Sequence, residues 1–277
     1  MKKLIRDKKI DGVYVGSHEG VIRHATQYLS ELGLPCYCSL EQWDTLMNKG
    51  RFKDLCVRFD IPVARRYEYS LEKPCKVEYP VITKPADGCA SVGVKICNNE
   101  NELVEGYKAA FENSLSHEVI VEKCVNNSGM DVFFQITNSE IEFCGLGDKY
   151  PVQLAPGAGS VAGARIIPSI YTSEFLHLFE EKIKRMFASL GLLQGLIWME
   201  VFHDGDSYYF NEVGYRPNGS LTIVSIDYFH NININNHHLI FRLDKFLFIE
   251  VFATFSGFPS FILLSTSMED LTPTSFL

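Results

Sequence analysis

The chain has 277 residues, of which 46% are hydrophobic and 22% are charged, and its formal net charge is −8. These values are typical of a soluble globular protein with one large domain or a few small subdomains. The acidic balance argues against nucleic acid or an anionic membrane as the main partner, although a local group of lysines can still bind phosphate. The eight cysteines form no C-x-x-C pair and lack zinc-site spacing, which favours reduced thiols in a cytoplasmic protein.

The first 43 residues predict part of a parallel α/β unit. Residues 11–20 are typical of a strand end and a loop, and the following apolar residues have helical spacing up to Gly33. CYCSL (36–40) predicts a short extended piece. A first strand and helix normally precede such a unit, so the N-terminal domain is predicted to be partial.

The middle of the chain predicts alternating helices and strands. The expected elements are a helix over 41–59 that ends before Ile61-Pro62, strands on either side of a small-residue loop in 79–97, a helix over 99–114 capped by Asn99, a strand at 118–125 and a hairpin over 131–150 turning at Asn138-Ser139. Residues 151–164 are Gly-rich and predict a loop that could act as a lid. The strongest helical pattern, 173–191, begins with a Ser cap and ends in Gly.

The pattern weakens after Ser220, and the C-terminal tail (231–277) is apolar and atypical. Residues 246–264 form a 19-residue apolar stretch, which raises the question of a membrane span. Glu250, Gly257 and Pro259 interrupt it, so a buried or irregular segment is the preferred interpretation.

Two predicted strands around HDGDS (203–207) each carry one glutamate, Glu200 and Glu212. Residues two apart share a face of a strand, so the relation of the two carboxylates depends on the loop between the strands. A two-residue turn puts them on opposite faces, a three-residue loop makes them diagonal neighbours, and a five-residue loop sets them directly opposite. On one face they would repel each other unless a divalent cation such as Mg²⁺ lay between them. A solvent-facing side, where both are harmless, is the alternative.

A candidate phosphate site begins at Lys84, which ends an apolar strand and opens KPADGCASVGV. Small residues allow backbone N–H groups to approach phosphate oxygens closely, and the lysine adds positive charge. Neither a Walker motif nor G-x-G-x-x-G is present, so a plain turn remains an alternative. VIVEKCV (119–125) could offer backbone groups to an adenine edge, or it could be an ordinary edge strand.

Taken in order, these pieces resemble the ATP-grasp superfamily, in particular its carbamoyl-phosphate-synthase-like and D-alanine-ligase-like carboxylate–amine ligases. The resemblance covers roughly residues 11–225. It rests on Lys49 in MNKGRFKD, Lys84 in KPADGCASVGV, Glu122 to Val125, Glu200 in WMEVF, and Glu212 with Arg216 in NEVGYRPNG. It implies an α+β fold in which two subdomains, 44–125 and 126–230, clasp ATP and follow the partial domain 1–43 along the chain.

The resemblance also implies roles for individual residues. Lys49 and Lys84 would contact ATP phosphates, and a loop containing Gly88, Ser91 and Gly93 would close over them. Glu122, Lys123 and Val125 would form the adenine hinge, and Asp131 would face the ribose. Lys149 would face the transferred phosphoryl group, Glu200 and Glu212 would hold Mg²⁺ or Mn²⁺, and Arg216 would stabilise the acyl-phosphate.

The chain departs from the family pattern where many members carry Asn two residues after the second metal glutamate, because Gly214 stands there. Asn211, Asn218 or water could replace it. The expected activity is ATP-dependent ligation of a small-molecule carboxylate to an amine, in a protein that could form a homodimer. A degenerate ATP-binding module without turnover is one alternative, and a small α/β binding domain anchored by its apolar tail is another.

Overall fold

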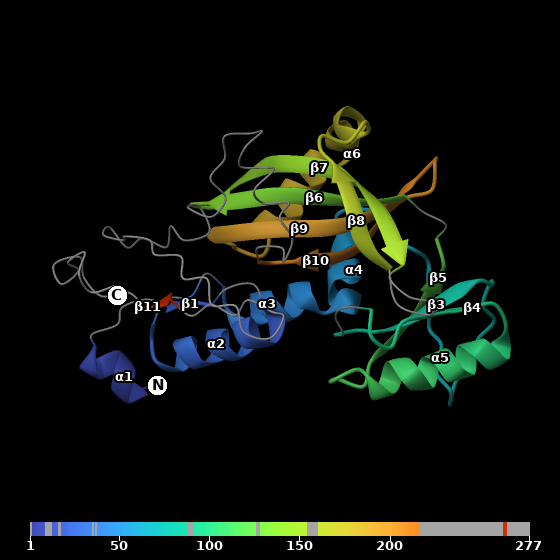
Figure 1. Ribbon diagram of the computed structural model, residues 1–277, viewed down its shortest axis with the longest axis horizontal. Helices are drawn as coiled ribbons and strands as arrows, with labels where there is room; N and C mark the ends of the chain where they lie inside the picture. Colours follow the sequence, from blue (N-terminus) through green and yellow to red (C-terminus); the bar gives the residue numbers. More distant parts are fainter. Residues whose placement is uncertain are drawn as a thin grey trace.

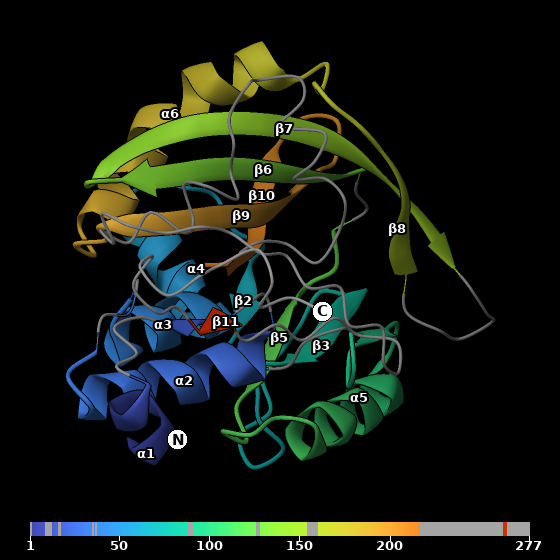
Figure 2. The ribbon, with the colours of Figure 1, turned by 60° about the vertical axis from the view of Figure 1, so that its left-hand side comes forward.

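The computed structural model describes residues 2–8, 13–15, 18–34, 36, 38–87, 91–125, 128–153, 160–216 and 263–264. Two antiparallel sheets dominate these residues, a small one of four strands and a large, curved one of five (Figures 1 and 2). The small sheet has the order β2-β5-β3-β4 and the large sheet the order β10-β9-β6-β7-β8. This mixed α+β architecture confirms the predicted fold class.

The N-terminal elements are α1 (Lys2–Asp7), β1 (Val13–Tyr14) and α2 (Glu19–Glu31). The helix predicted before Gly33 is confirmed as α2, and Gly33 follows it with a φ of 67°, which suits glycine. The prediction that the strand near residue 13 belongs to a parallel unit is wrong. β1 pairs antiparallel with β11 (Leu263–Leu264), a contact between distant segments that no local pattern predicts.

The single helix predicted over 41–59 is wrong, because two helices occupy it: α3 (Leu40–Met47) and α4 (Lys49–Arg58). Asn48 separates them, with an extended ψ of 112° and a side chain that accepts a hydrogen bond from the backbone N–H of Arg51 at 3.0 Å. An asparagine cap stabilises a helix start, so the chain turns here although the apolar spacing continues. The break places Lys49 at the first residue of α4.

The small sheet contains β2 (Arg66–Tyr67), β3 (Val81–Pro85), β4 (Lys95–Cys97) and β5 (Val119–Lys123). Helix α5 (Glu100–Glu112) lies against β3 and β4, as Figure 1 shows, and Asn99 caps it as predicted. Their small core contains Val81, Cys97, Leu103 and Val121.

The large sheet contains β6 (Ser128–Thr137), β7 (Glu140–Gln153), β8 (Ser160–Ile166), β9 (Gln194–His203) and β10 (Tyr208–Gly214). The predicted turn is confirmed, since Asn138 and Ser139 have φ of 52° and 69° between β6 and β7. The prediction of a loop over all of 151–164 is wrong. Pro151 pairs with Ala162 and Gln153 with Ser160, so strand pairing extends into this segment, and 154–159 lie outside the described residues.

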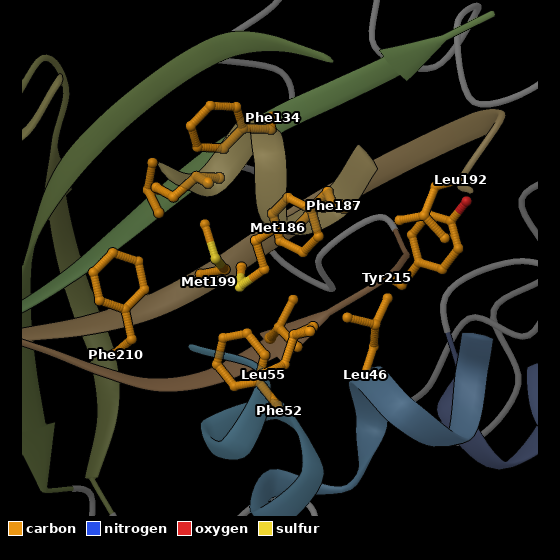
Figure 3. Close-up of a cluster of buried hydrophobic side chains, with 14 of the residues drawn as sticks. Leu46, Phe52, Leu55, Phe134, Met186, Phe187, Leu192, Met199, Phe210 and Tyr215 are labelled. Atoms are coloured by element: carbon orange, nitrogen blue, oxygen red, sulfur yellow. The ribbon is translucent and has the colours of Figure 1, made fainter. Parts of the chain in front are cut away.

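Helix α6 (Thr172–Ala188) packs on one face of the large sheet and confirms the strongest predicted helix. Its predicted Ser cap is wrong, because Tyr171 occupies the N-cap position and makes no side-chain cap bond. The main core joins α6 to β6, β9 and β10 and also to α3 and α4. Figure 3 shows Leu46, Phe52 and Leu55 of these two helices facing the same cluster as Met186, Met199 and Phe210.

The described part of the chain holds no helix that combines the length and hydrophobicity of a membrane span. Of the apolar stretch 246–264, the structure describes Leu263 and Leu264, and the rest lies outside the described residues.

Candidate functional site

The two glutamates of the β9–β10 hairpin lie directly opposite each other. His203 pairs with Tyr208, so the connecting loop is 204–207, an even length that by itself would put the glutamates on opposite faces. A β-bulge between Phe210 and Glu212 adds one residue, and from there Glu212 pairs with Glu200. The structure therefore reaches the one-face arrangement by a route that differs from all three loop lengths considered above.

A third carboxylate continues this row, because Asp131 on β6 pairs with Glu200 on β9. Asp131 is buried, whereas the side chains of Glu200 and Glu212 are 17% and 31% exposed. Directly opposite side chains have Cβ atoms about 5 Å apart, which is within reach of one cation. The opposite face of the same strands carries Met199 and Val201, which belong to the main core.

Positive side chains surround the carboxylate row. Lys149 on β7 donates to Glu200 and lies 3.5 Å from Asp131, whose other oxygen accepts from Arg165 Nε at 2.6 Å. Lys49 Nζ lies 3.3 Å from Glu212. Partial burial would raise the pKa of Glu212, but Lys49 and Lys84 outweigh it and hold that pKa below its usual value. Burial would likewise lower the pKa of Lys149, and Glu200 with Asp131 raises it instead.

Lys84 lies at the end of β3 that leads into the candidate phosphate loop. It is buried, donates to Glu122, and donates to Asn211 Oδ1 at 2.7 Å. Asn211 in turn donates to Glu200 at 2.6 Å. The bulged residue Asn211 therefore connects Lys84 of the small sheet to Glu200 of the large sheet.

The loop after Lys84 is attached to α4. The backbone N–H of Lys49 donates to the carbonyl of Ala86 at 2.9 Å, so the helix start and the loop start are fixed together. Gly93 has a φ of 74°, and a Cβ there would lie 2.9 Å from Asn113 Cβ, so glycine is required. Ser91 has a φ of 57°, and Gly88 lies outside the described residues.

The segment predicted as an adenine hinge has its glutamate turned inward. Glu122 on β5 is buried between Lys84 and Lys53, so its side chain faces the protein interior. The backbone N–H of Lys123 donates to Arg65 O at 2.8 Å, and its ammonium group donates to the carbonyls of residues 78 and 79 at 3.2 Å. Val125 lies two residues beyond the end of β5.

Arg216 lies just beyond β10 and reaches the N-terminus of α2. Its Nε donates to Glu19 at 3.0 Å, and its guanidinium carbon lies 5.5 Å from the ring centre of Trp198. Trp198 also explains the departure at Gly214, because a Cβ there would lie 2.1 Å from the indole nitrogen. No larger residue fits without moving the indole. Asn218 lies outside the described residues.

Four residues of this site were given no role from the sequence pattern: Glu19, Lys53, Asn211 as a link to Lys84, and Arg165. For Lys53 a signal exists in retrospect. It stands four residues after Lys49 and three before buried Cys56, so it shares a helical face with both. The roles of Glu19, Asn211 and Arg165 depend on contacts between distant segments, which local patterns do not show.

The donor set suits a hard divalent cation. Two carboxylates on neighbouring strands, both partly exposed, leave room for water and phosphate oxygens, as Mg²⁺ prefers. Within the described ranges, no cluster of three or more His, Cys, Asp or Glu residues is arranged to hold a metal ion. A cation at Glu200 and Glu212 would therefore need ligands from water or nucleotide. Glu200 and Glu212 already accept from lysines, so those contacts would rearrange.

Comparison with known proteins identifies the fold class as ATP-grasp and confirms the resemblance drawn from the sequence. Residues 61–151 match the family model of the D-ala D-ala ligase C-terminus. The chain thus has the ATP-grasp fold, with a D-alanine-ligase-like segment spanning the small sheet and the first hairpin of the large one.

Three solved structures illustrate the similarity. L-amino acid ligase from Bacillus licheniformis has a TM-score of 0.71 at 19% identity, covering 86% of this chain and 57% of that one. Biotin carboxylase from Campylobacter jejuni has a TM-score of 0.65 at 19% identity, covering 76% and 49%. VanG D-Ala:D-Ser ligase from Enterococcus faecalis has a TM-score of 0.60 at 19% identity, covering 73% and 62%. The chain thus spans less than two thirds of the length of each.

Proposed function

We propose that this chain is an ATP- and Mg²⁺-dependent ligase that activates a carboxylate as an acyl-phosphate for attack by an amine. The observation that carries this proposal is the direct pairing of Glu200 with Glu212, connected through Asn211 to Lys84. A phosphate-binding lysine and a pair of cation-binding carboxylates in one network are what phosphoryl transfer requires. The ATP-grasp fold and the ligase names of the structural neighbours support the same class.

We assign the nucleotide to the space between the small sheet and the large sheet, with residues 44–125 and 126–230 acting as the two clasping subdomains. Lys49 and Lys84 contact phosphate oxygens, helped by backbone N–H groups of the loop that contains Gly88, Ser91 and Gly93. Backbone groups of Lys123 and Val125 bind the adenine edge. Glu200 and Glu212 would hold Mg²⁺ or Mn²⁺, which would supply positive charge to neutralise the phosphate oxygens.

The remaining charged residues act on the reacting groups. Lys149 faces the transferred phosphoryl group. It donates to Glu200 in this structure, and we expect it to move from Glu200 to the phosphoryl group when nucleotide binds. Arg216 neutralises the acyl-phosphate, with Trp198 supporting its guanidinium. Asp131, proposed from the family pattern to face the ribose, instead binds Arg165 and Lys149. We therefore propose that it orients these two cations.

The test is a screen of carboxylate and amine pairs for ATP-dependent release of ADP and phosphate by the full chain. Turnover that requires both an acid and Mg²⁺ supports the ligase. ATP binding without turnover across many acids supports the degenerate binding module. Lys84→Ala should weaken ATP binding by about 1.5–3 kcal/mol, the value of a charge-assisted hydrogen bond. Undiminished ATP affinity in this variant would contradict the assigned phosphate site.

A further inference from the structure

Lys53 on α4 is fully buried, with a side-chain exposure of 0%. Lysine is rarely buried completely, because its charge loses the stabilisation of water unless a partner replaces it. Its ammonium group donates to Glu122 and lies 3.5 Å from Asn211 Oδ1. A side chain so enclosed does not touch a ligand, so any effect it has on the site acts through these neighbours.

Glu122 is divided between two lysines. One carboxylate oxygen accepts from Lys53 and the other from Lys84. When both lysines are protonated, two buried ammonium groups share one carboxylate and the trio carries one positive charge in excess. Burial, and then the charge of Lys84, lower the pKa of Lys53 to about 7, whereas the two lysines outweigh burial and hold the pKa of Glu122 below its usual value. The surplus charge makes the contact between Lys84 and Glu122 easier to exchange.

The trio lies where the two sheets meet. Glu122 and Lys84 belong to β5 and β3 of the small sheet, Asn211 belongs to β10 of the large sheet, and Lys53 comes from α4, which contacts β10 (Figures 1 and 2). Lys84 differs from Lys53 in one respect that matters. It donates to Asn211 Oδ1 at 2.7 Å, whereas Lys53 Nζ lies 3.5 Å from the same atom, so Lys84 is the member of the trio closer to the residue that donates to Glu200.

We propose that Lys53 is a positioning residue that holds Glu122 and thereby leaves Lys84 free to bind nucleotide phosphate. This inference rests on the proposed function, because it takes the ligand of Lys84 to be a phosphate group. Without Lys53, Glu122 and Lys84 form a neutral buried pair with both carboxylate oxygens available to one ammonium. Phosphate then has to compete with that closed pair. With Lys53 present, Glu122 keeps a partner when Lys84 moves to the ligand, so no buried carboxylate is left unpaired.

A purely structural role for Lys53, fastening α4 to β5, predicts a different outcome. Loosening α4 would disturb the whole nucleotide site, since Lys49 at the helix start contacts both Glu212 and the loop carbonyl of Ala86. Binding of the nucleoside part and of the phosphate part would then weaken together. The proposed role affects the phosphate part alone, so ATP and adenosine separate the two.

The experiment measures dissociation constants of MgATP and adenosine by calorimetry for the full-length chain and for Lys53→Met. We expect the Kd for MgATP to rise about tenfold, the scale of one weakened charge-assisted hydrogen bond, while the Kd for adenosine stays within about twofold. Arg58→Met, which removes an exposed charge from the same helix, is the matched control and should change neither constant. Equal weakening of both ligands, or an unchanged Kd for MgATP, would overturn the inference.

The double variant Lys53→Met/Glu122→Gln provides the second measurement. Neutralising Glu122 removes the competitor for Lys84, so the Kd for MgATP should return to within about threefold of the wild-type value. Persistence of the tenfold loss would contradict the proposed role. If Lys53→Met alone does not fold, the double variant still tests the proposed role, because a Kd for MgATP more than about threefold above the wild-type value contradicts it. A wild-type chain that binds adenosine but not MgATP would reject the proposed function itself, whereas normal wild-type binding with an unaffected Lys53→Met rejects this inference alone.

Discussion

Within the described residues of the candidate site, an enclosed group (Glu122 with Lys53 and Lys84) and an open pair (Glu200 and Glu212) both place carboxylates beside lysines, and they differ in exposure. Glu122 is 3% exposed and lies between Lys53 and Lys84, whereas Glu200 and Glu212 are 17% and 31% exposed on the face of the large sheet. Each carboxylate has a cationic partner within the protein. Burial therefore separates a carboxylate that is enclosed by protein contacts from the two that we propose as metal ligands.

The difference in exposure lets one hydrogen-bond network both position Lys84 and leave Glu200 and Glu212 accessible. The enclosed group fixes the position of Lys84, and the open pair remains accessible to ligand atoms, with Asn211 donating to one group and accepting from the other. Because Asn211 is the bulged residue that also brings Glu212 opposite Glu200, a single local irregularity sets both the pairing and the connection.

The largest effect is expected from the open pair. Glu200→Ala or Glu212→Ala should abolish Mg²⁺-dependent ATP turnover while circular dichroism and the unfolding temperature show a folded protein, since neither side chain belongs to the core. Glu140→Ala, an exposed glutamate at the start of β7, is the matched control and should retain full turnover. Full phosphate release by both active-site variants would remove the basis for distinguishing the open pair from Glu122.

A larger residue at Gly214, beside the open pair, should lower the stability of the fold by steric overlap and leave the net charge unchanged. Gly214→Asn would restore the residue common in the family, but its Cβ would lie 2.1 Å from the Trp198 indole nitrogen. Overpacking of this kind costs about 1–3 kcal/mol, which urea unfolding would measure. The cost should fall when Gly214→Asn is made in a Trp198→Ala background, as a double-mutant cycle would show. An equal cost in both backgrounds would mean that the indole is not the obstacle.

The enclosed carboxylate, Glu122, should contribute to the dependence of the unfolding free energy on pH in acid. The pKa of Glu122 is lower in the fold than its usual value, so its contribution to stability is complete above the unfolded pKa of about 4.3 and is lost as the pH falls through the folded value. Between about pH 5 and pH 2, the free energy of unfolding should therefore fall more steeply for the wild type than for Glu122→Gln. Each unit of pKa difference is worth about 1.4 kcal/mol. Parallel pH profiles from urea unfolding would show that Glu122 has no such shift.

Elements with a local signal were predictable from the sequence. The amphipathic spacing of α2, α5 and α6, the Asn99 cap and the turn at Asn138-Ser139 each depend on residues within one or two turns of chain, and the structure confirms them. The ATP-grasp fold was predictable too, because several weak motifs follow one another in the family's order.

Features set by distant partners were not predictable in the same way. The bulge at Asn211 exists only in relation to β9, and the pairing of 151–153 with 160–162 overrides a Gly- and Ala-rich composition that favours loops. Lys53 shows the same limit. Its helical position was readable, but its burial depends on Glu122, sixty-nine residues further along the chain. The helix break at Asn48 did have a local signal in the cap residue, which the continuous apolar spacing concealed.

The smallest expected effect concerns Asn48, which caps the helix that contributes a lysine to the enclosed group and another to the open pair. Asn48 caps α4, the helix that carries both Lys49 and Lys53, and its amide also donates to Glu118 at 3.0 Å. Asn48→Ala should lower the free energy of unfolding by about 1 kcal/mol, the usual value of an N-cap. Asn48→Asp keeps the cap acceptor and loses the donor, so it should cost less at the helix start while placing a charge beside Glu118. If Asn48→Asp is the more damaging change in urea unfolding, the contact with Glu118 matters more than the cap, and α4 is positioned by the small sheet rather than by its own helix start.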